Sequence, residues 1–181
     1  MKLSQAFIFG FLVGFALCYF AVRPETSGPA VILSDQLWVQ AYFSPDDDVE
    51  NVIAYWIGRA NSSIEIAMYT FTSSRLAQSL IDAAKRGVDV KVILEKNNVN
   101  QYSKYVILKS NGVGVQLDGN PSLMHNKFCI IDREIVITGS YNWTKSAREE
   151  NDENVVLVGC SELADLYHEE FQEMWSGQYG G

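Results

Sequence analysis

The sequence has few of the residues that build metal sites and disulfide frameworks. Its 181 residues include three cysteines and two histidines. Cys18, Cys129 and Cys160 form no CxxC pair, and no histidine lies at zinc-ligand spacing from them. We therefore expect no metal and no other cofactor. Cys129 and Cys160 are interpreted as small buried residues, and a disulfide between them is the alternative outside the cytoplasm.

Basic residues are also scarce. Lysine and arginine total 14 against 22 acids, which gives a net charge of −8. An acidic chain argues mildly against a polyanionic partner, because nucleic-acid binding depends on basic surfaces. It does not exclude one, since Lys127, Lys145 and Arg148 could form a local positive cluster on an acidic body.

Only one long apolar run occurs, AFIFGFLVGFALCYFAV at residues 6–22, between Lys2 and Arg23. As a helix it would be about 26 Å long, slightly less than the roughly 30 Å hydrocarbon core of a bilayer. A retained membrane anchor is favoured over a cleaved signal peptide, and the charge bias favours a catalytic body outside the cytoplasm, periplasmic or extracellular. Secretion after signal cleavage is the alternative.

The chain divides into an anchor or signal segment at 1–23, a linker at 24–36, one folded domain at 37–176 and a tail at 177–181. Apolar patterning in the domain predicts alternating strands and helices, with a final amphipathic helix. This order predicts an α/β fold with a mixed, mainly parallel central sheet and helices on both faces. Strands are expected at 37–43, 64–68, 88–94, 113–117 and 155–158, and helices at 46–57, 74–86, 102–108 and 163–175.

The polar residues most suited to chemistry lie between positions 124 and 154. Residues 128–131 and 135–137 are expected to form a hairpin. Side chains alternate along strands, so His125 and Lys127 share one face, as do Ser140 and Asn142. Hairpin pairing would bring these four together. An imidazole, a fixed cation and two neutral donors suit an anionic tetrahedral centre, and phosphate ester chemistry is the natural interpretation.

The same residues resemble the HxK(x)4D(x)6GSxN signature of the phospholipase D superfamily, through His125, Lys127, Asp132, Gly139, Ser140 and Asn142. Glu153 resembles the downstream acid of that family. The likeness extends from about residue 39 to 175, in the manner of the bacterial Nuc-type endonucleases and mitochondrial cardiolipin hydrolases, which carry a single motif. The resemblance implies the phospholipase D/nuclease fold.

The resemblance also implies roles. His125 would attack phosphorus to form a phosphohistidine, Lys127 would bind phosphate oxygens, Ser140 and Asn142 would complete the anion cradle, and Glu153 would fix the imidazole tautomer. Because only one motif is present, the second catalytic histidine would come from a second copy, which implies a homodimer with a composite active site.

Three assignments stay open. For Asp132, a turn or structural role is at least as well supported as chemistry. Trp143, with Tyr141, would contact substrate by stacking, or would pack in the core. His168 is expected to be a surface or boundary residue, because nothing near it in the sequence completes a site.

We expect a metal-independent phosphodiesterase, and we favour an endonuclease acting on single- or double-stranded nucleic acid. The alternative substrate is a phospholipid, either phosphatidylcholine or cardiolipin. A third reading is a non-catalytic protein that binds nucleic acid or membrane.

Overall fold

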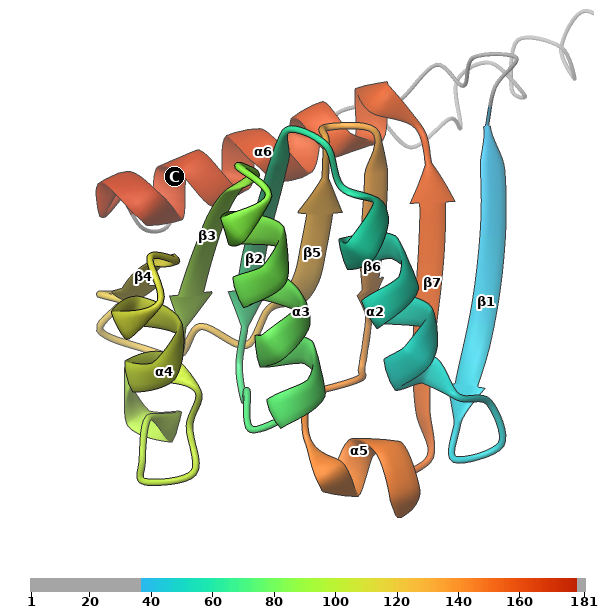
Figure 1. Cartoon of the computed structure of the whole chain (residues 1–181), viewed down its shortest axis with the longest axis horizontal. Coiled ribbons are helices and arrows are strands. Elements are labelled where there is room, and N and C mark those ends of the chain that lie inside the picture. The colour runs from blue at the N-terminus through green and yellow to red at the C-terminus, as the bar shows by residue number, and fades with distance from the viewer. Residues whose placement is uncertain (1–36, 179–181) are drawn as a thin grey trace, which may run out of the picture. The chain divides into compact units, whose positions relative to one another are not determined.

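The computed structural model describes residues 37–178 and contains one sheet of seven strands in the order β1-β7-β6-β5-β2-β3-β4 (Figure 1). The predicted α/β class with a mixed sheet is confirmed. The strands are β1 (Trp38–Ser44), β2 (Ser63–Met68), β3 (Asp89–Leu94), β4 (Gly114–Leu117), β5 (Lys127–Ile131), β6 (Ile135–Gly139) and β7 (Glu153–Gly159).

The sheet is less parallel than predicted. Only the β2–β3 and β3–β4 pairs are parallel, whereas β1–β7, β7–β6, β6–β5 and β5–β2 are antiparallel. The connections explain this: α3 and α4 carry the chain back between the parallel strands β2, β3 and β4, whereas β5 and β6 form a hairpin and the short α5 joins β6 to its antiparallel neighbour β7. The first strand then pairs with the last at one edge, which no local pattern indicates.

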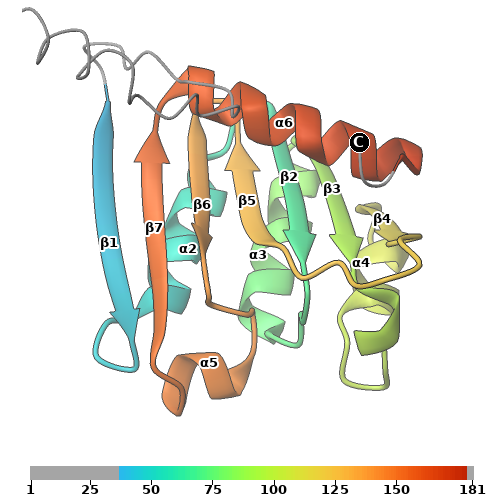
Figure 2. The same ribbon diagram turned by 180° about the vertical axis from the view of Figure 1, so that it is seen from behind.

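Helices cover both faces of the sheet, as predicted. In Figure 1, α2 (Val49–Arg59), α3 (Ser74–Lys85) and α4 (Tyr105–Ser110) lie on one face. Figure 2 shows α6 (Ser161–Ser176) crossing the opposite face. The short α5 (Lys145–Glu149) lies at one edge, and the single turn η1 (Lys96–Asn98) follows β3. Two apolar cores result, one on each side of the sheet.

The helix starts follow from capping side chains. The Asp48 carboxylate accepts the Asn51 N–H at 3.3 Å at the start of α2, within the acid run that predicted it. Ser73, one residue before the predicted cap, accepts the Leu76 N–H at 3.1 Å at the start of α3. Gly177 ends α6 in the left-handed region with φ 81°.

Several predictions concern residues beyond the described range. The proposed anchor or signal at 1–23 and linker at 24–36 lie outside it, as do the last residues of the tail. Within residues 37–178 no helix has the length and apolar character needed to cross a bilayer. Cys129 and Cys160 are buried and unbonded, so the alternative of a disulfide is not realised in this structure.

Candidate active site

One end of the strands, called the site edge from here on, brings together most of the predicted site residues. Lys127 starts β5, Ser140 follows the end of β6, and Glu153 starts β7. Since β5 and β7 are antiparallel to β6, the starts of β5 and β7 lie at the edge where β6 ends. Figure 2 shows that α5, which follows Asn142 in the chain, lies at this same edge.

His125 is exposed just before β5, and its ring packs against Tyr69. The two ring centroids are 4.4 Å apart at an interplanar angle of 63°. Tyr69 follows directly after β2, and its backbone N–H donates to the Asn126 carbonyl at 3.0 Å. The connection therefore holds the imidazole at the edge of the domain with open access from solvent.

Lys127 contacts both the backbone of His125 and the ring of Tyr69. Its Nζ donates to the His125 carbonyl at 2.8 Å and lies 4.9 Å from the centroid of the Tyr69 ring. Burial lowers the pKa of Lys127, and the negative charge of Glu153 acts in the opposite direction. The ammonium group is thus fixed near the imidazole and has a carboxylate as its electrostatic partner.

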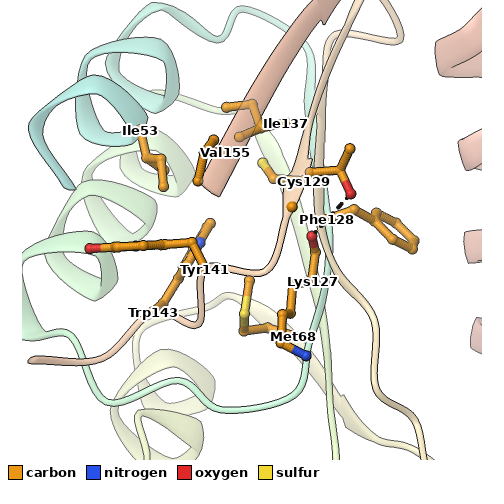
Figure 3. Close-up of a pocket in the computed structure, with 11 residues that line it drawn as sticks. Ile53, Met68, Lys127, Phe128, Cys129, Ile137, Tyr141, Trp143 and Val155 are labelled. Atoms are coloured by element: carbon orange, nitrogen blue, oxygen red, sulfur yellow. Dashed lines mark hydrogen bonds between the residues drawn. The ribbon is translucent and has the colours of Figure 1, made fainter. Parts of the chain in front are cut away.

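A narrow apolar pocket of about 10 Å³ lies behind the lysine. Figure 3 shows Lys127 beside Met68, with Cys129, Ile137 and Val155 further inside. This volume is near the minimum that holds one water molecule, so the pocket supports the lysine stem and does not accept a substrate. A larger hollow of about 350 Å³ is lined by His125, Glu170 and Glu173 among other residues.

Ser140 and Glu153 form a hydrogen-bonded pair across β6 and β7. The Ser140 hydroxyl donates to the Glu153 carboxylate at 2.5 Å and accepts the Asn154 N–H at 3.1 Å. The second Glu153 oxygen accepts from Asn151 Nδ2 at 2.9 Å. Within residues 37–178 Glu153 forms no hydrogen bond to the His125 imidazole, so its tautomer-fixing role stays a prediction.

This pair also explains the glycine of the motif. A Cβ at Gly139 would lie 2.1 Å from the Asn154 carbonyl oxygen, which is far inside van der Waals contact. Glycine therefore allows β6 and β7 to approach closely enough for Ser140 to reach Glu153. Because the Ser140 hydroxyl donates its hydrogen bond to the Glu153 carboxylate, Ser140 holds that carboxylate in position in this structure.

Asn142 is oriented by the loop after β2, which also contains Tyr69. Its Oδ1 accepts the backbone N–H of Thr70 at 3.2 Å. In the part of the chain that the structure describes, its Nδ2 has no protein partner and can donate to an anion. Thr70 and Tyr69 are neighbours after β2, so one loop orients both the amide and the imidazole.

Asp132 lies at the opposite end of β5 and has a structural role. Its carboxylate accepts the backbone N–H groups of Asn61, Ser62 and Ser63 at 2.7–3.1 Å, and also the Ser62 hydroxyl. Burial raises the pKa of Asp132, but these hydrogen bonds outweigh burial and the net shift is downward. The structural alternative is thus favoured over direct chemistry.

Of the two interpretations of Trp143, the structure supports core packing and not substrate contact. Trp143 is 2% exposed, and its ring meets Phe71 edge-on with centroids 4.9 Å apart. Its carbonyl accepts the N–H groups of Thr72 and Ser73, so the residue joins the site loop to the core. Tyr141 is likewise buried. Both rings pack inward because the chain turns into the α2 and α3 layer after Ser140, as Figure 3 shows for their side chains.

Sequence reasoning missed Tyr69 and Thr70 as parts of the site. The available signal was their position directly after β2, at the end of a strand in a parallel pair, where α/β proteins commonly place ligands. It also missed the partner of His168, whose Nδ1 lies 2.7 Å from Oε2 of the buried Glu65. Gln172 donates to the other oxygen of Glu65 at 2.8 Å.

The donor set at the edge suits an anion. The groups held near Tyr69 and Thr70 are the Lys127 ammonium, the Asn142 amide and the His125 imidazole, and none of these three is a carboxylate or a thiolate. Among residues 37–178 no three histidine, cysteine or acidic side chains are grouped as metal ligands. The arrangement can bind phosphate oxygens and present an imidazole nitrogen to phosphorus.

Comparison with known proteins gives consistent matches. A family model described as "Cardiolipin synthase, PLD-like domain" matches residues 53–175. A phospholipase D of Rickettsia bellii is 40% identical over 130 residues, which are 71% of this chain and 65% of the relative. A mitochondrial cardiolipin hydrolase of Mus musculus is 35% identical over 117 residues, 64% of this chain and 53% of the relative. The chain thus spans less than two thirds of these relatives.

Two solved structures match over nearly their whole lengths. Nuc from Salmonella typhimurium, described as a phospholipase D family member, has a TM-score of 0.75 and 31% identity, and the match covers 78% of this chain and 96% of Nuc. NucT from Helicobacter pylori has a TM-score of 0.74 and 26% identity, covering 78% of this chain and 98% of NucT.

Proposed function

Because this chain belongs to the phospholipase D superfamily, in its branch with one HxK motif per chain, we propose that it is a metal-independent phosphodiesterase that cleaves internal bonds of nucleic acid. One observation carries the choice of substrate. His125 is exposed in the single copy, so a phosphodiester within a long polymer can reach its imidazole. The full-length match to Nuc and NucT supports the same choice, since the sequence resembles that nuclease group.

The proposed reaction has two displacements at phosphorus. One His125 nitrogen attacks, the bond from phosphorus to the leaving oxygen breaks, and that oxygen takes a proton from the second His125. Water then attacks the phosphohistidine, gives its proton to the second imidazole, and the phosphorus–nitrogen bond breaks. Each histidine returns to its starting state.

Charge stabilisation comes from groups already in place. An ammonium 4 Å from a phosphate oxygen contributes roughly 4 kcal/mol at an effective dielectric constant near 20. Lys127 supplies this charge, and the free Nδ2 of Asn142 supplies a directed donor. Because these groups are held before substrate binds, little reorganisation is needed when charge develops on phosphorus.

The mechanism requires a homodimer. The chain has two histidines, and His168 is bonded to Glu65 on the α6 face, so His125 alone lies at the site. The second imidazole must then come from His125 of another copy, related by a two-fold axis.

A phospholipid is the second candidate substrate. The Rickettsia bellii relative at 40% identity is named phospholipase D, and the Mus musculus relative is named mitochondrial cardiolipin hydrolase. The chemistry at phosphorus would be the same.

We also propose that residues 1–23 anchor the protein in a membrane with the domain outside the cytoplasm, which the apolar run and its flanking charges support.

A substrate panel with a single inactive control tests the proposal. The full chain and its His125→Ala variant are assayed in a chelator on single-stranded DNA, duplex DNA, RNA, phosphatidylcholine and cardiolipin. We expect nucleic-acid cleavage by the full chain and its loss in the variant. Cleavage of lipid alone would replace the nuclease by the second candidate, and equal activity of the variant would exclude His125 as the nucleophile.

A further inference from the structure

The segment between residues 96 and 117 has a charge opposite to that of the chain. It contains Lys96, Lys104 and Lys109 and no acid, whereas the whole chain carries −8. The acids on either side, Glu95 and Asp118, are 0% and 3% exposed. This part of the surface is therefore locally basic on an acidic protein.

The same segment exposes large apolar side chains. Val106 is 71% exposed, Tyr102 66% and Ile107 47%. Helix α4 packs on the core through Leu108, which is fully buried, so Val106 and Ile107 lie on its outer face. Lys109 is exposed in the same helix, with its Nζ 3.0 Å from the Tyr105 hydroxyl. Exposed aliphatic groups beside lysines are typical of surfaces that contact membranes.

This surface lies beside the active site. The Lys104 N–H donates to the Phe71 carbonyl at 3.1 Å, and Asn98 Nδ2 donates to the Tyr69 carbonyl at 3.0 Å. The loop after β2, whose Tyr69 packs against His125, is thus directly bonded to the segment leading into α4. Figure 1 shows the loop before α4 and the helix α5 at the same edge of the sheet.

We propose that the α4 surface, formed by Tyr102, Lys104, Val106, Ile107 and Lys109, docks on a bilayer that contains anionic lipid. The lysines match anionic headgroups, and the aliphatic side chains can enter the headgroup layer. A nucleic acid would use the lysines and the tyrosine but would give no partner to Val106 or Ile107. The inference goes beyond the proposed function and holds for either substrate.

The linker after the predicted anchor is long enough to allow contact between the α4 surface and the bilayer. The 13 residues from 24 to 36 can extend about 43–47 Å at the usual 3.3–3.6 Å per residue. The seven residues of β1, which lead from the linker toward the site edge, span about 23 Å at 3.3 Å per residue. The linker is therefore long enough for the site edge to face the same bilayer that holds the anchor.

Hydrogen exchange on the full chain tests the docking. The protein is reconstituted in vesicles of phosphatidylcholine, with or without phosphatidylglycerol, so that any anchor contributes equally to both samples. We expect the amides of residues 100–108 to exchange about tenfold more slowly in the anionic vesicles. Equal exchange in the two samples would overturn the proposal.

Three variants make the result specific. Val106→Asp should abolish the protection, whereas Val39→Asp should leave it unchanged. Val39 is 57% exposed on β1, which is the outermost strand on the side of the sheet away from β4. Lys109→Glu gives an independent second test. Hydrolysis of bis(p-nitrophenyl) phosphate in solution should persist in all three, which separates docking from chemistry. Protection by an oligonucleotide without vesicles, and none by vesicles, would assign the surface to nucleic acid and overturn the proposal.

Discussion

At the scale of single residues, Tyr69 connects the two groups that we propose to act on phosphate. Its ring contacts the His125 imidazole at 4.4 Å between centroids and lies 4.9 Å from Lys127 Nζ. The tyrosine touches neither reacting atom in the proposed mechanism. It is a positioning residue that acts through the imidazole and the ammonium.

Removal of this ring should lower turnover more than binding. We expect Tyr69→Ala to reduce kcat by about tenfold to a hundredfold, because a misplaced nucleophile costs mainly transition-state geometry. Tyr69→Phe keeps the ring and should retain most of the activity. Steady-state kinetics on a soluble phosphodiester give the comparison, and equal losses in both variants would show that the hydroxyl, not the ring, matters.

The Lys127–Glu153 pair predicts a change in the alkaline limb of the pH profile. Burial lowers the pKa of Lys127, and Glu153 raises it. Glu153→Gln removes the raising effect, so Lys127 should lose its proton at lower pH and kcat/KM should begin to fall at lower pH. The limb should not move when Glu153→Gln is combined with Lys127→Arg, because arginine stays protonated. An unmoved limb in the single variant would show that Lys127 does not control it.

At the scale of secondary structure, residues of the HxK motif lie at both ends of β5. Lys127 is at its start, and Asp132 follows its end, where three backbone N–H groups at the start of β2 converge on one carboxylate. Asp132 itself has φ 54°, a left-handed conformation that aspartate tolerates better than most residues. The aspartate of the motif thus fixes the β5–β6 turn against β2.

Asp132→Asn should destabilise the fold without altering the chemistry. We expect a loss of about 1–3 kcal/mol in the free energy of unfolding, since an amide replaces a charged acceptor of several hydrogen bonds. The folded pKa of Asp132 lies below its ordinary value, so its contribution is present above the unfolded pKa and is lost as the pH falls through the folded pKa.

Denaturant unfolding at neutral and acidic pH measures this effect. The difference between the wild type and Asp132→Asn should shrink toward acidic pH, and kcat of the folded variant should be unchanged. Asp82→Asn, at a carboxylate whose side chain is 54% exposed, is the matched surface control and should change little. A large fall in kcat with unchanged stability would instead place Asp132 in the catalytic chemistry.

Local patterns were sufficient to predict some elements and not others. The β5–β6 hairpin and the convergence of Lys127 and Ser140 at one edge follow from alternation and strand pairing between near neighbours. The 3₁₀ turn η1 and the five-residue α5 are too short for a periodic signal. Tyr69 could not be joined to His125 from sequence, because the contact depends on β2 pairing with β5 across more than fifty residues.

At the scale of the whole molecule, the two histidines have different positions. Glu65 of β2 binds His168 of α6 across 103 residues of chain, a pairing that no local pattern could predict. The interaction fixes α6 on its face of the sheet and removes His168 from consideration as a second catalytic group. One copy therefore supplies a single imidazole to the site edge.

Subunit mixing measures most directly whether two copies of His125 act on one phosphorus. Wild-type and His125→Ala chains are unfolded together in equal amounts, refolded and assayed on a soluble phosphodiester. A composite site predicts about one quarter of the activity of the same total amount of wild type, because only dimers of two intact chains are active. Activity near one half would mean that each chain works alone and would contradict the account.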